Sequence, residues 1–258
     1  MIRFKSLGSG SSGNATVIQA RSDGHIAHLL VDCGLGIREL DKRLGAAGML
    51  AEQVDAIFIT HEHGDHIGCA RQLALRERIP VWMSEGTYTA LGQPDFAGLL
   101  RLACDGEDFD IGGLQVRPFT VPHDAREPLQ LTCSDGDVRL GLVTDLGHVS
   151  AHVLDELAAC ATLLLECNHD EALLRESRYP AFLKRRVGGA YGHLANGAAA
   201  ALAQSIAAHG RLRQVLAAHL SEQNNKPELA RAALLAALGT SAEIHVADAA
   251  SGSGWLTV

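Results

Sequence analysis

The sequence has no charge-free apolar run of about 18 residues or more, and its first residues do not form a secretory signal. A membrane-spanning helix needs about 20 predominantly apolar residues. A signal peptide needs an apolar core followed by a cleavage site. Residues 2–7 instead have the composition of a strand. We therefore expect a cytoplasmic protein without a membrane span.

The sequence also lacks any CxxC pair, although it contains six cysteines, at positions 33, 69, 104, 133, 160 and 167. Scattered single cysteines are untypical of a disulfide framework. We predict that these cysteines act as small apolar side chains in a reduced cytoplasm.

Low aromatic content and a lack of net positive charge limit how the chain could bind nucleic acid. Aromatic residues make up 4% of the sequence, which is too few for an extended platform of stacked bases. The formal net charge of -8 argues against a protein that coats nucleic acid through bulk electrostatics. The main local exception is a basic cluster, which could bind phosphate or could be a solvated helix face. It consists of Arg175, Arg178, Lys184, Arg185 and Arg186.

Apolar patterning predicts an α+β fold made of short elements. Strands are predicted at residues 2–7, 15–20, 27–32, 55–60, 81–84, 114–120, 129–134, 138–144, 162–167, 215–220, 243–248 and 254–258. Helices are predicted at about residues 36–47, 67–77, 150–160, 195–208 and 227–238. The Asp-Gly pair at 135–136 predicts a hairpin turn. This order favours two mixed β-sheets flanked by helices, in one domain over residues 1–258.

The densest cluster of chemically active residues is the hexad His61-Glu62-His63-Gly64-Asp65-His66, which follows the predicted strand 55–60. Three imidazoles and a carboxylate in a tight turn can point toward two neighbouring cations. Imidazole nitrogen and carboxylate oxygen suit zinc and related divalent metals. A polar turn that is rich in histidine by chance is the less favoured interpretation.

This hexad resembles the hallmark motif of the metallo-β-lactamase-fold hydrolase superfamily. The resemblance implies a four-layer αβ/βα sandwich with a two-metal site along one edge, and further ligands at three later strand ends. It assigns His61, His63 and His123 to one metal, Asp65, His66 and His219 to the other, and Asp145 to the bridge between them. Zinc fits this set, and manganese or iron is compatible with it.

The implied chemistry is hydrolysis by a hydroxide that two cations activate. Two cations about 3.5–4 Å apart lower the pKa of a shared water and neutralise anionic oxygens of the substrate. Asp65 would additionally orient the hydroxide. An NTP-binding loop is excluded, because the glycine-rich segment 8–14 lacks the Lys and Ser/Thr that such a loop needs. That segment is either a hairpin or a loop whose amides face an anion.

Hydrolysis of a phosphodiester also needs a proton for the leaving group. Strand 162–167 ends in Glu166, and the later segment Gly192-His193-Leu194 opens an alanine-rich helix. This order resembles ribonuclease Z and its nuclease relatives, which implies that His193 is the general acid and Glu166 its orienting partner. A carboxylate partner would keep the imidazole protonated near neutral pH. A strand-end acid and a histidine beside a helix start are the structural alternatives.

Motifs along nearly the whole chain are most similar to the YycJ/WalJ-like branch of the superfamily. They are Ser9-Gly-Ser-Ser-Gly-Asn14, Thr60-His-Glu-His-Gly-Asp-His66, Thr144-Asp-Leu-Gly-His148, Glu166-Cys-Asn-His-Asp170, Gly192-His-Leu-Ala-Asn196 and His219-Leu-Ser-Glu-Gln-Asn-Asn225. Members of that branch are similar to exonucleases that act on DNA 5′ ends. His148 and His169 would then contact substrate phosphate or support the site, with surface histidines as the alternative. Lys184, Arg185 and Arg186 are weaker candidates for substrate binding.

The leading hypothesis is therefore a metal-dependent phosphodiesterase, namely a 5′-to-3′ DNA exonuclease. The alternatives are a small-molecule or cyclic phosphodiesterase of the PhnP type and, less favoured, a non-catalytic metal-binding partner protein. Processing of tRNA is disfavoured, because the chain has no long Gly/Pro-rich insertion that could grip tRNA. An amphipathic surface helix could support a homodimer.

Overall fold

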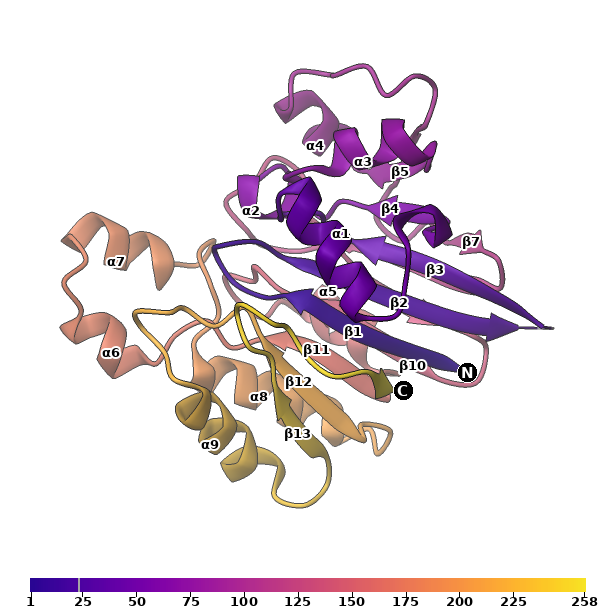
Figure 1. The fold of residues 1–258 in the computed structure, drawn as a ribbon. Helices are drawn as coiled ribbons and strands as arrows, with labels where there is room; N and C mark the ends of the chain where they lie inside the picture. Colours follow the sequence, from indigo (N-terminus) through magenta and orange to yellow (C-terminus); the bar gives the residue numbers. More distant parts are fainter. Residues whose placement is uncertain (23) are drawn as a thin grey trace.

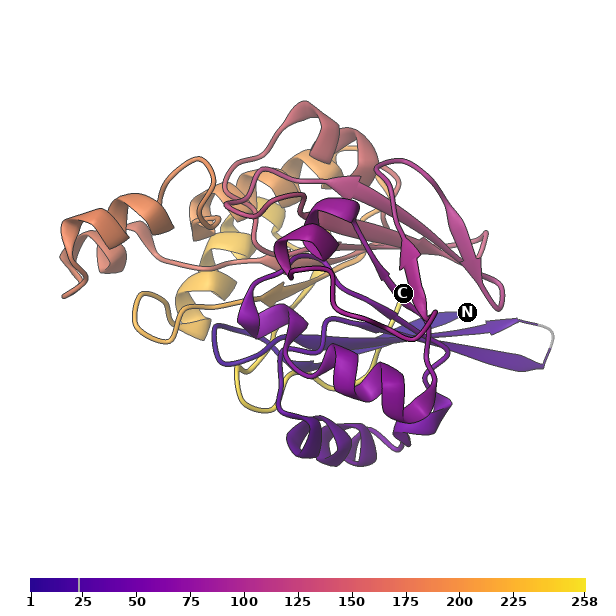
Figure 2. The same ribbon diagram turned by 90° about the horizontal axis from the view of Figure 1, so that it is seen from above.

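The computed structural model describes residues 1–22 and 24–258, which form two facing β-sheets with helices on their outer sides (Figure 1, Figure 2). The first sheet has the order β14-β1-β2-β3-β4-β5-β6. Its strands are β1 (Ile2–Gly8), β2 (Ala15–Ser22), β3 (His25–Val31), β4 (Ala56–Phe58), β5 (Val81–Met83), β6 (Leu100–Leu102) and β14 (Leu256–Thr257). The second has the order β13-β12-β11-β10-β9-β8-β7. Its strands are β7 (Phe109–Ile111), β8 (Leu114–Thr120), β9 (Leu129–Ser134), β10 (Arg139–Val143), β11 (Thr162–Glu166), β12 (Gln214–Ala218) and β13 (Glu243–Val246).

The helices fall into three groups. Those on the first sheet's side are α1 (Ile37–Ala46), α2 (Gly64–Ile67), α3 (Ala70–Glu77) and α4 (Glu85–Ala90), with a short 3-10 turn at Ala51–Gln53. Those covering the second sheet are α5 (Ala151–Leu157), α8 (Asn196–Ala207) and α9 (Pro227–Leu238). The third group, α6 (Glu171–Glu176) and α7 (Ala181–Val187), projects from the rim of the sandwich in both views (Figure 1, Figure 2).

Three buried apolar clusters account for the layers, because successive strand side chains point to opposite faces. On β11, Leu164 joins the cluster between the two sheets, whereas Leu163 and Leu165 join the cluster under α5, α8 and α9. On β3, Leu29 faces the other sheet and Leu30 packs under α1 and α3. Strands buried on both faces in this way lie in the middle of a sandwich covered by helices. The predicted fold class is confirmed.

The register of the parallel strands positions the site. β10, β11 and β12 run parallel, with Val143 opposite Leu165 and Glu166 opposite Ala218, so their carboxyl ends lie level. In the first sheet β3 and β4 are also parallel, with Val31 opposite Phe58. The segments that follow these strands therefore meet at one edge of the sandwich.

The predicted elements agree with the structure except at several ends and interruptions. The helix predicted at about 67–77 is present as α3 but begins later, at Ala70, because Gly68 has a φ of 28° and separates α2 from α3. A side chain at Gly68 would lie 2.3 Å from the carbonyl oxygen of Cys33, so the backbones touch there. The strand predicted at 55–60 is shorter, at Ala56–Phe58. The short elements β6, β7, α4, α6 and α7 were not predicted.

Two further predictions concern side chains and membrane spans. The cysteine prediction holds for five positions, but Cys104 is exposed rather than buried, since it follows the edge strand β6. None of the cysteines of the described residues forms a disulfide. Among these residues no helix has the length and apolarity that crossing a membrane requires.

Candidate metal centre

The histidine hexad lies in the loop after β4, and a buried aspartate from the neighbouring strand supports it. Asp32 follows β3, and its Oδ1 accepts a hydrogen bond from the backbone N–H of Thr60 at 2.9 Å. Its Oδ2 lies 2.8 Å from Nδ1 of His66. The backbone φ of Asp32 is 62°, a conformation that costs free energy and is retained where the surroundings fix it. Asp32 was not predicted as a site residue, because its only signal in the sequence is its place at the end of the apolar strand 27–32.

One group of imidazole nitrogens converges at the hexad. Nδ1 of His63 lies 3.1 Å from Nε2 of His61 and 3.3 Å from Nε2 of His123. One nitrogen cannot donate to two acceptors at once. Nitrogens that bind one zinc tetrahedrally at 2.0–2.1 Å are about 3.3–3.4 Å apart. The two spacings therefore fit ligands of a shared cation better than mutual hydrogen bonds.

A second group lies beside the first. Oδ2 of Asp65 is 3.6 Å from Nε2 of His66 and 3.7 Å from Nε2 of His219. Asp145 lies between the groups, with Oδ2 at 3.1 Å from Nε2 of His66 and Oδ1 at 3.9 Å from Nε2 of His123. Within each three-residue group the possible ligand atoms lie within 4.8 Å of one another. The structure thus brings together all seven residues that the sequence analysis assigned to metals, in the same two groups.

Hydrogen bonds on the far side of four imidazole rings aim their Nε2 atoms at this centre. Nδ1 of His61 lies 3.0 Å from Oγ1 of Thr60, and Nδ1 of His123 lies 3.1 Å from the carbonyl oxygen of Gly192. The Nδ1 atoms of the other two, His66 and His219, face carboxylates. Such partners fix the tautomer and leave the other nitrogen free to bind a metal.

Two buried atoms in the centre lack hydrogen-bond partners among the described residues. They are Oδ2 of Asp145 and Nε2 of His219. Both residues also have positive φ angles, 55° and 56°. A buried polar atom without a partner is costly, and a divalent cation would satisfy both atoms. The donor set and these two atoms fit a site for divalent metal ions.

The charges of the buried residues also fit a site for divalent metal ions. Burial opposes ionisation of Asp145, but the neighbouring His219 and His66 hold the pKa of its carboxyl well below the usual range. Burial lowers the pKa of His61 and of His123, which keeps both rings neutral and available as ligands. The pKa of His219 shifts in the other direction. Burial alone would lower this pKa, but nearby carboxylates, led by Asp145, raise it to about 10. The crowded carboxylates therefore require positive charge here, which protons or metal ions can supply.

Glu166 and His193 form a pair beside the metal-ligand groups. Oε1 of Glu166 lies 2.9 Å from Nδ1 of His193 and 3.0 Å from Nδ1 of His219. Its Oε2 accepts hydrogen bonds from the backbone N–H groups of Leu146 and Leu194. Although Glu166 could be counted among metal ligands, both its oxygens are already engaged. We therefore treat it as a partner of histidines.

The pKa values of this pair are shifted in opposite directions. Burial opposes ionisation of Glu166, but His193 and then His219 lower the pKa of its carboxyl to about 2. Burial also disfavours a charged His193, but the Glu166 carboxylate outweighs it and raises the pKa of the imidazole. The side chain of His193 is 25% exposed. Its ring lines a cavity beside the metal-ligand groups. A protonated imidazole at this position can act as an acid.

The remaining site candidates are divided between two cavities. A cavity of about 410 Å³ beside the metal-ligand groups is lined by Arg186 and Asp124, whose side chains pair at 2.6 Å. The other four candidates, His148, His169, Lys184 and Arg185, line a neighbouring cavity of about 770 Å³. Arg178 lines neither. The basic cluster is thus not one surface, because α7 places successive residues on different sides.

The glycine-rich loop adopts the hairpin conformation between β1 and β2. Oγ of Ser9 accepts a hydrogen bond from the backbone N–H of His219 at 2.7 Å. Asn14 accepts one from Gly10 and donates to the backbone oxygen of Asp65. The loop therefore supports the second group, through His219 and Asp65. Whether its amides face an anion stays a prediction.

A substitution at Gly34 tests how tightly the backbone packs against the hexad loop. A Cβ atom at Gly34 would lie 1.7 Å from the carbonyl oxygen of Asp65, so Gly34→Ala must displace the hexad loop. We expect the free energy of unfolding to fall by about 1–3 kcal/mol, together with the metal content. Gly45→Ala, where a Cβ meets nothing within 4 Å in α1, should stabilise by about 0.5–1 kcal/mol. Denaturant titration measures both, and a fully stable Gly34→Ala variant would show that the contact is unimportant.

Comparison with known proteins gives relatives over nearly the whole chain. The family described as "Beta-lactamase superfamily domain" matches residues 27–219. Exodeoxyribonuclease YycJ of Bacillus anthracis is 32% identical over 96% of this chain and 96% of its own. Exodeoxyribonuclease WalJ of Streptococcus pneumoniae is 30% identical over 95% of this chain and 93% of its own. A diphosphatase from the PhnP family has the same fold, with a TM-score of 0.69, 16% identity and coverage of 100% and 98%.

Proposed function

The chain belongs to the metallo-β-lactamase superfamily, and on that basis we propose that it is a metal-dependent exonuclease that degrades DNA from the 5′ end. The enzyme class is a hydrolase of phosphodiester bonds. The Glu166–His193 pair beside the metal-ligand groups is the observation that carries the mechanism. The similarity to two exodeoxyribonucleases over nearly the whole chain supports DNA as the substrate.

The metal centre would hold two divalent ions, with zinc or manganese preferred and iron compatible. Their ligands would be His61, His63 and His123 for one ion, Asp65, His66 and His219 for the other, and Asp145 shared. Such ions acidify an attacking water and neutralise the phosphate oxygens.

The chain's own residues supply the remaining steps. The carboxylate of Asp65 lines the metal-side cavity and would orient the attacking water. His193 would donate a proton to the oxygen that leaves phosphorus, since it reaches the same cavity. Glu166 would hold the imidazole ring in place and keep it protonated. A sugar alkoxide is a strongly basic leaving group, so a proton donor is most useful for a nucleotide substrate.

Basic residues near the centre favour DNA over a small diester. Arg186 lines the metal-side cavity, and Lys184 and Arg185 continue along α7 toward the larger cavity. Although Arg186 is paired with Asp124, Lys184 and Arg185 place positive charge in the larger cavity, which fits a polyanionic chain. A small cyclic phosphodiester would need only the metal-side cavity.

The substrate class can be tested by offering duplex DNA, a cyclic nucleotide and bis-p-nitrophenyl phosphate to the protein loaded with manganese or zinc. We expect DNA to be degraded to mononucleotides, and the activity to be absent in the double variant His61→Ala/Asp65→Ala. Turnover of the small diesters with intact DNA would favour a PhnP-type phosphodiesterase. Inactivity on all three substrates, with metal bound, would favour a non-catalytic metal-binding protein.

A further inference from the structure

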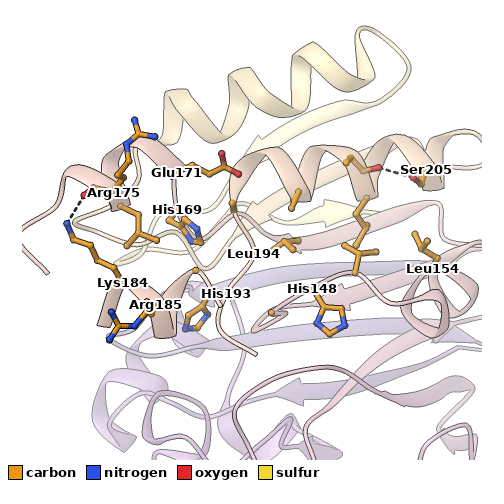
Figure 3. Close-up of a pocket in the computed structure, with 18 residues that line it drawn as sticks. His148, Leu154, His169, Glu171, Arg175, Lys184, Arg185, His193, Leu194 and Ser205 are labelled. Carbon is orange, nitrogen blue, oxygen red and sulfur yellow. Dashed lines mark hydrogen bonds between the residues drawn. The ribbon is translucent and has the colours of Figure 1, made fainter. Parts of the chain in front are cut away.

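The cavity of about 770 Å³, whose lining residues Figure 3 shows, shares His193 with the metal-side cavity. Its volume is within the range of about 300–1,000 Å³ that small-molecule sites occupy. One wall is apolar, with Leu154 and Leu194 among its residues. Three basic residues from α6 and α7 form the opposite end, namely Arg175, Lys184 and Arg185 (Figure 3).

A buried histidine in this cavity lacks a partner. His169 is 3% exposed, and its Nδ1 forms no hydrogen bond with any residue that the structure describes. Its backbone is fixed, because its carbonyl oxygen accepts a hydrogen bond from the N–H of Asn196 at 2.9 Å. A buried ring nitrogen without a partner is costly. The ring lines the cavity, but Nδ1 itself is buried, so a ligand with polar edges would satisfy it after the ring has turned.

The position of His193 shows which part of a substrate would reach this cavity. If His193 protonates the leaving oxygen, the group attached to that oxygen must lie on the His193 side of phosphorus. The larger cavity lies on that side, since His193 is a wall common to both cavities. We propose that this cavity binds the nucleotide that leaves, which is the 5′-terminal nucleotide of the DNA strand. The inference rests on the proposed exonuclease function and deepens it.

The chemistry of the lining residues fits each part of a nucleotide. The apolar wall suits a base, and His169 and Glu171 can bond to its polar edge. The basic end suits the terminal 5′-phosphate. Nζ of Lys184 lies 2.6 Å from the carbonyl oxygen of Arg175, and no ion pair involves Arg185 within the described ranges 1–22 and 24–258. Both cationic groups can therefore be offered to a phosphate.

The reaction balances as an ordinary hydrolysis. The oxygen of water forms a new bond to phosphorus, and the bond from phosphorus to the 3′ oxygen of the terminal nucleotide breaks. That oxygen takes a proton from His193, which regains one from the attacking water. The shortened strand keeps the phosphorus as a new 5′-phosphate, and a nucleoside 5′-monophosphate leaves. Each product strand thus carries the same terminal phosphate that the basic end would recognise.

The cleavage test compares duplexes that carry a 5′-phosphate or a 5′-hydroxyl on the same sequence. We expect the wild type to have a kcat/KM about tenfold higher for the phosphorylated end, the effect of a charge-assisted contact. Lys184→Ala/Arg185→Ala should remove this preference through KM. Arg178→Ala is the matched control, because Arg178 is exposed on the same projection and lines neither cavity. Equal cleavage of both ends by the wild type would overturn the assignment.

A binding test needs no catalysis. Ala201 is exposed on α8 and lines the cavity, so Ala201→Trp should fill it and weaken binding of 5′-dAMP about tenfold or more in calorimetry of the metal-loaded protein. Ala236→Trp, at an exposed position of α9, is the control. DNA degradation that neither Ala201→Trp nor the basic double variant affects would overturn the cavity assignment and leave the proposed function standing. If the wild type left DNA intact while Ala201→Trp weakened dAMP binding, the proposed exonuclease function would be overturned. The nucleotide site would still be supported.

Discussion

Replacing Asp145 with alanine should lower the rate of DNA cleavage by about a thousandfold or more, which corresponds to about 4 kcal/mol of transition-state stabilisation. Asp145 is buried between the two metal-ligand groups, within reach of His66 on one side and His123 on the other. Its loss should affect both ions at once, because no other carboxylate lies at that position. Elemental analysis should find fewer than two metal ions per chain in the variant, and initial-rate assays give the loss of activity.

The control for this substitution is Asp155→Ala, since Asp155 is an exposed aspartate on α5. It should retain wild-type activity and metal content. Circular dichroism distinguishes loss of the site from loss of the fold. An Asp145→Ala variant that kept two metals and its full rate would show that Asp145 is not the shared ligand.

Replacing His193 with alanine should have the second largest effect, and the effect should depend on the leaving group. A general acid contributes about 10²–10⁴-fold when the leaving oxygen needs a proton. DNA cleavage leaves a strongly basic sugar alkoxide, so it should slow by that factor. Hydrolysis of bis-p-nitrophenyl phosphate leaves a weakly basic nitrophenolate, so it should slow by less than about tenfold. Paired measurements of kcat on the two substrates give the comparison.

His209→Ala serves as the matched control, because His209 is exposed just after α8 and outside both cavities. Neither substrate should respond to it. If His193→Ala slowed both substrates equally, His193 would be holding the site together rather than supplying a proton. That outcome would make the Glu166–His193 pair a structural contact.

Four of the seven proposed metal ligands could be predicted from the sequence because their chemistry is concentrated in one segment. These four lie within six consecutive positions, and Asp145 and His219 follow runs that are visibly strands. The resemblance to the superfamily motif assigned the later residues, because the hexad follows β4 of the first sheet whereas Asp145 and His219 follow strands of the second. The parallel register of β10, β11 and β12 brings Asp145, Glu166 and His219 to one edge of the second sheet.

Other parts of the site depend on tertiary structure. Asp32 is one aspartate after one strand, and only the packing of β3 against β4 brings it to Thr60 and His66. The helices α6 and α7 are too short to show clear periodicity. The division of the basic cluster between two cavities follows from how α7 lies beside His193, which no local pattern encodes.

The most direct test of the exonuclease proposal is a time course on one duplex labelled at either its 5′ or its 3′ end, with manganese or zinc and with Asp145→Ala as the blank. The proposal predicts that the 5′ label is released first, as a mononucleotide, while the 3′ label remains on a steadily shortening strand. Release from the 3′ end first, or internal fragments that retain the 5′ label, would contradict it.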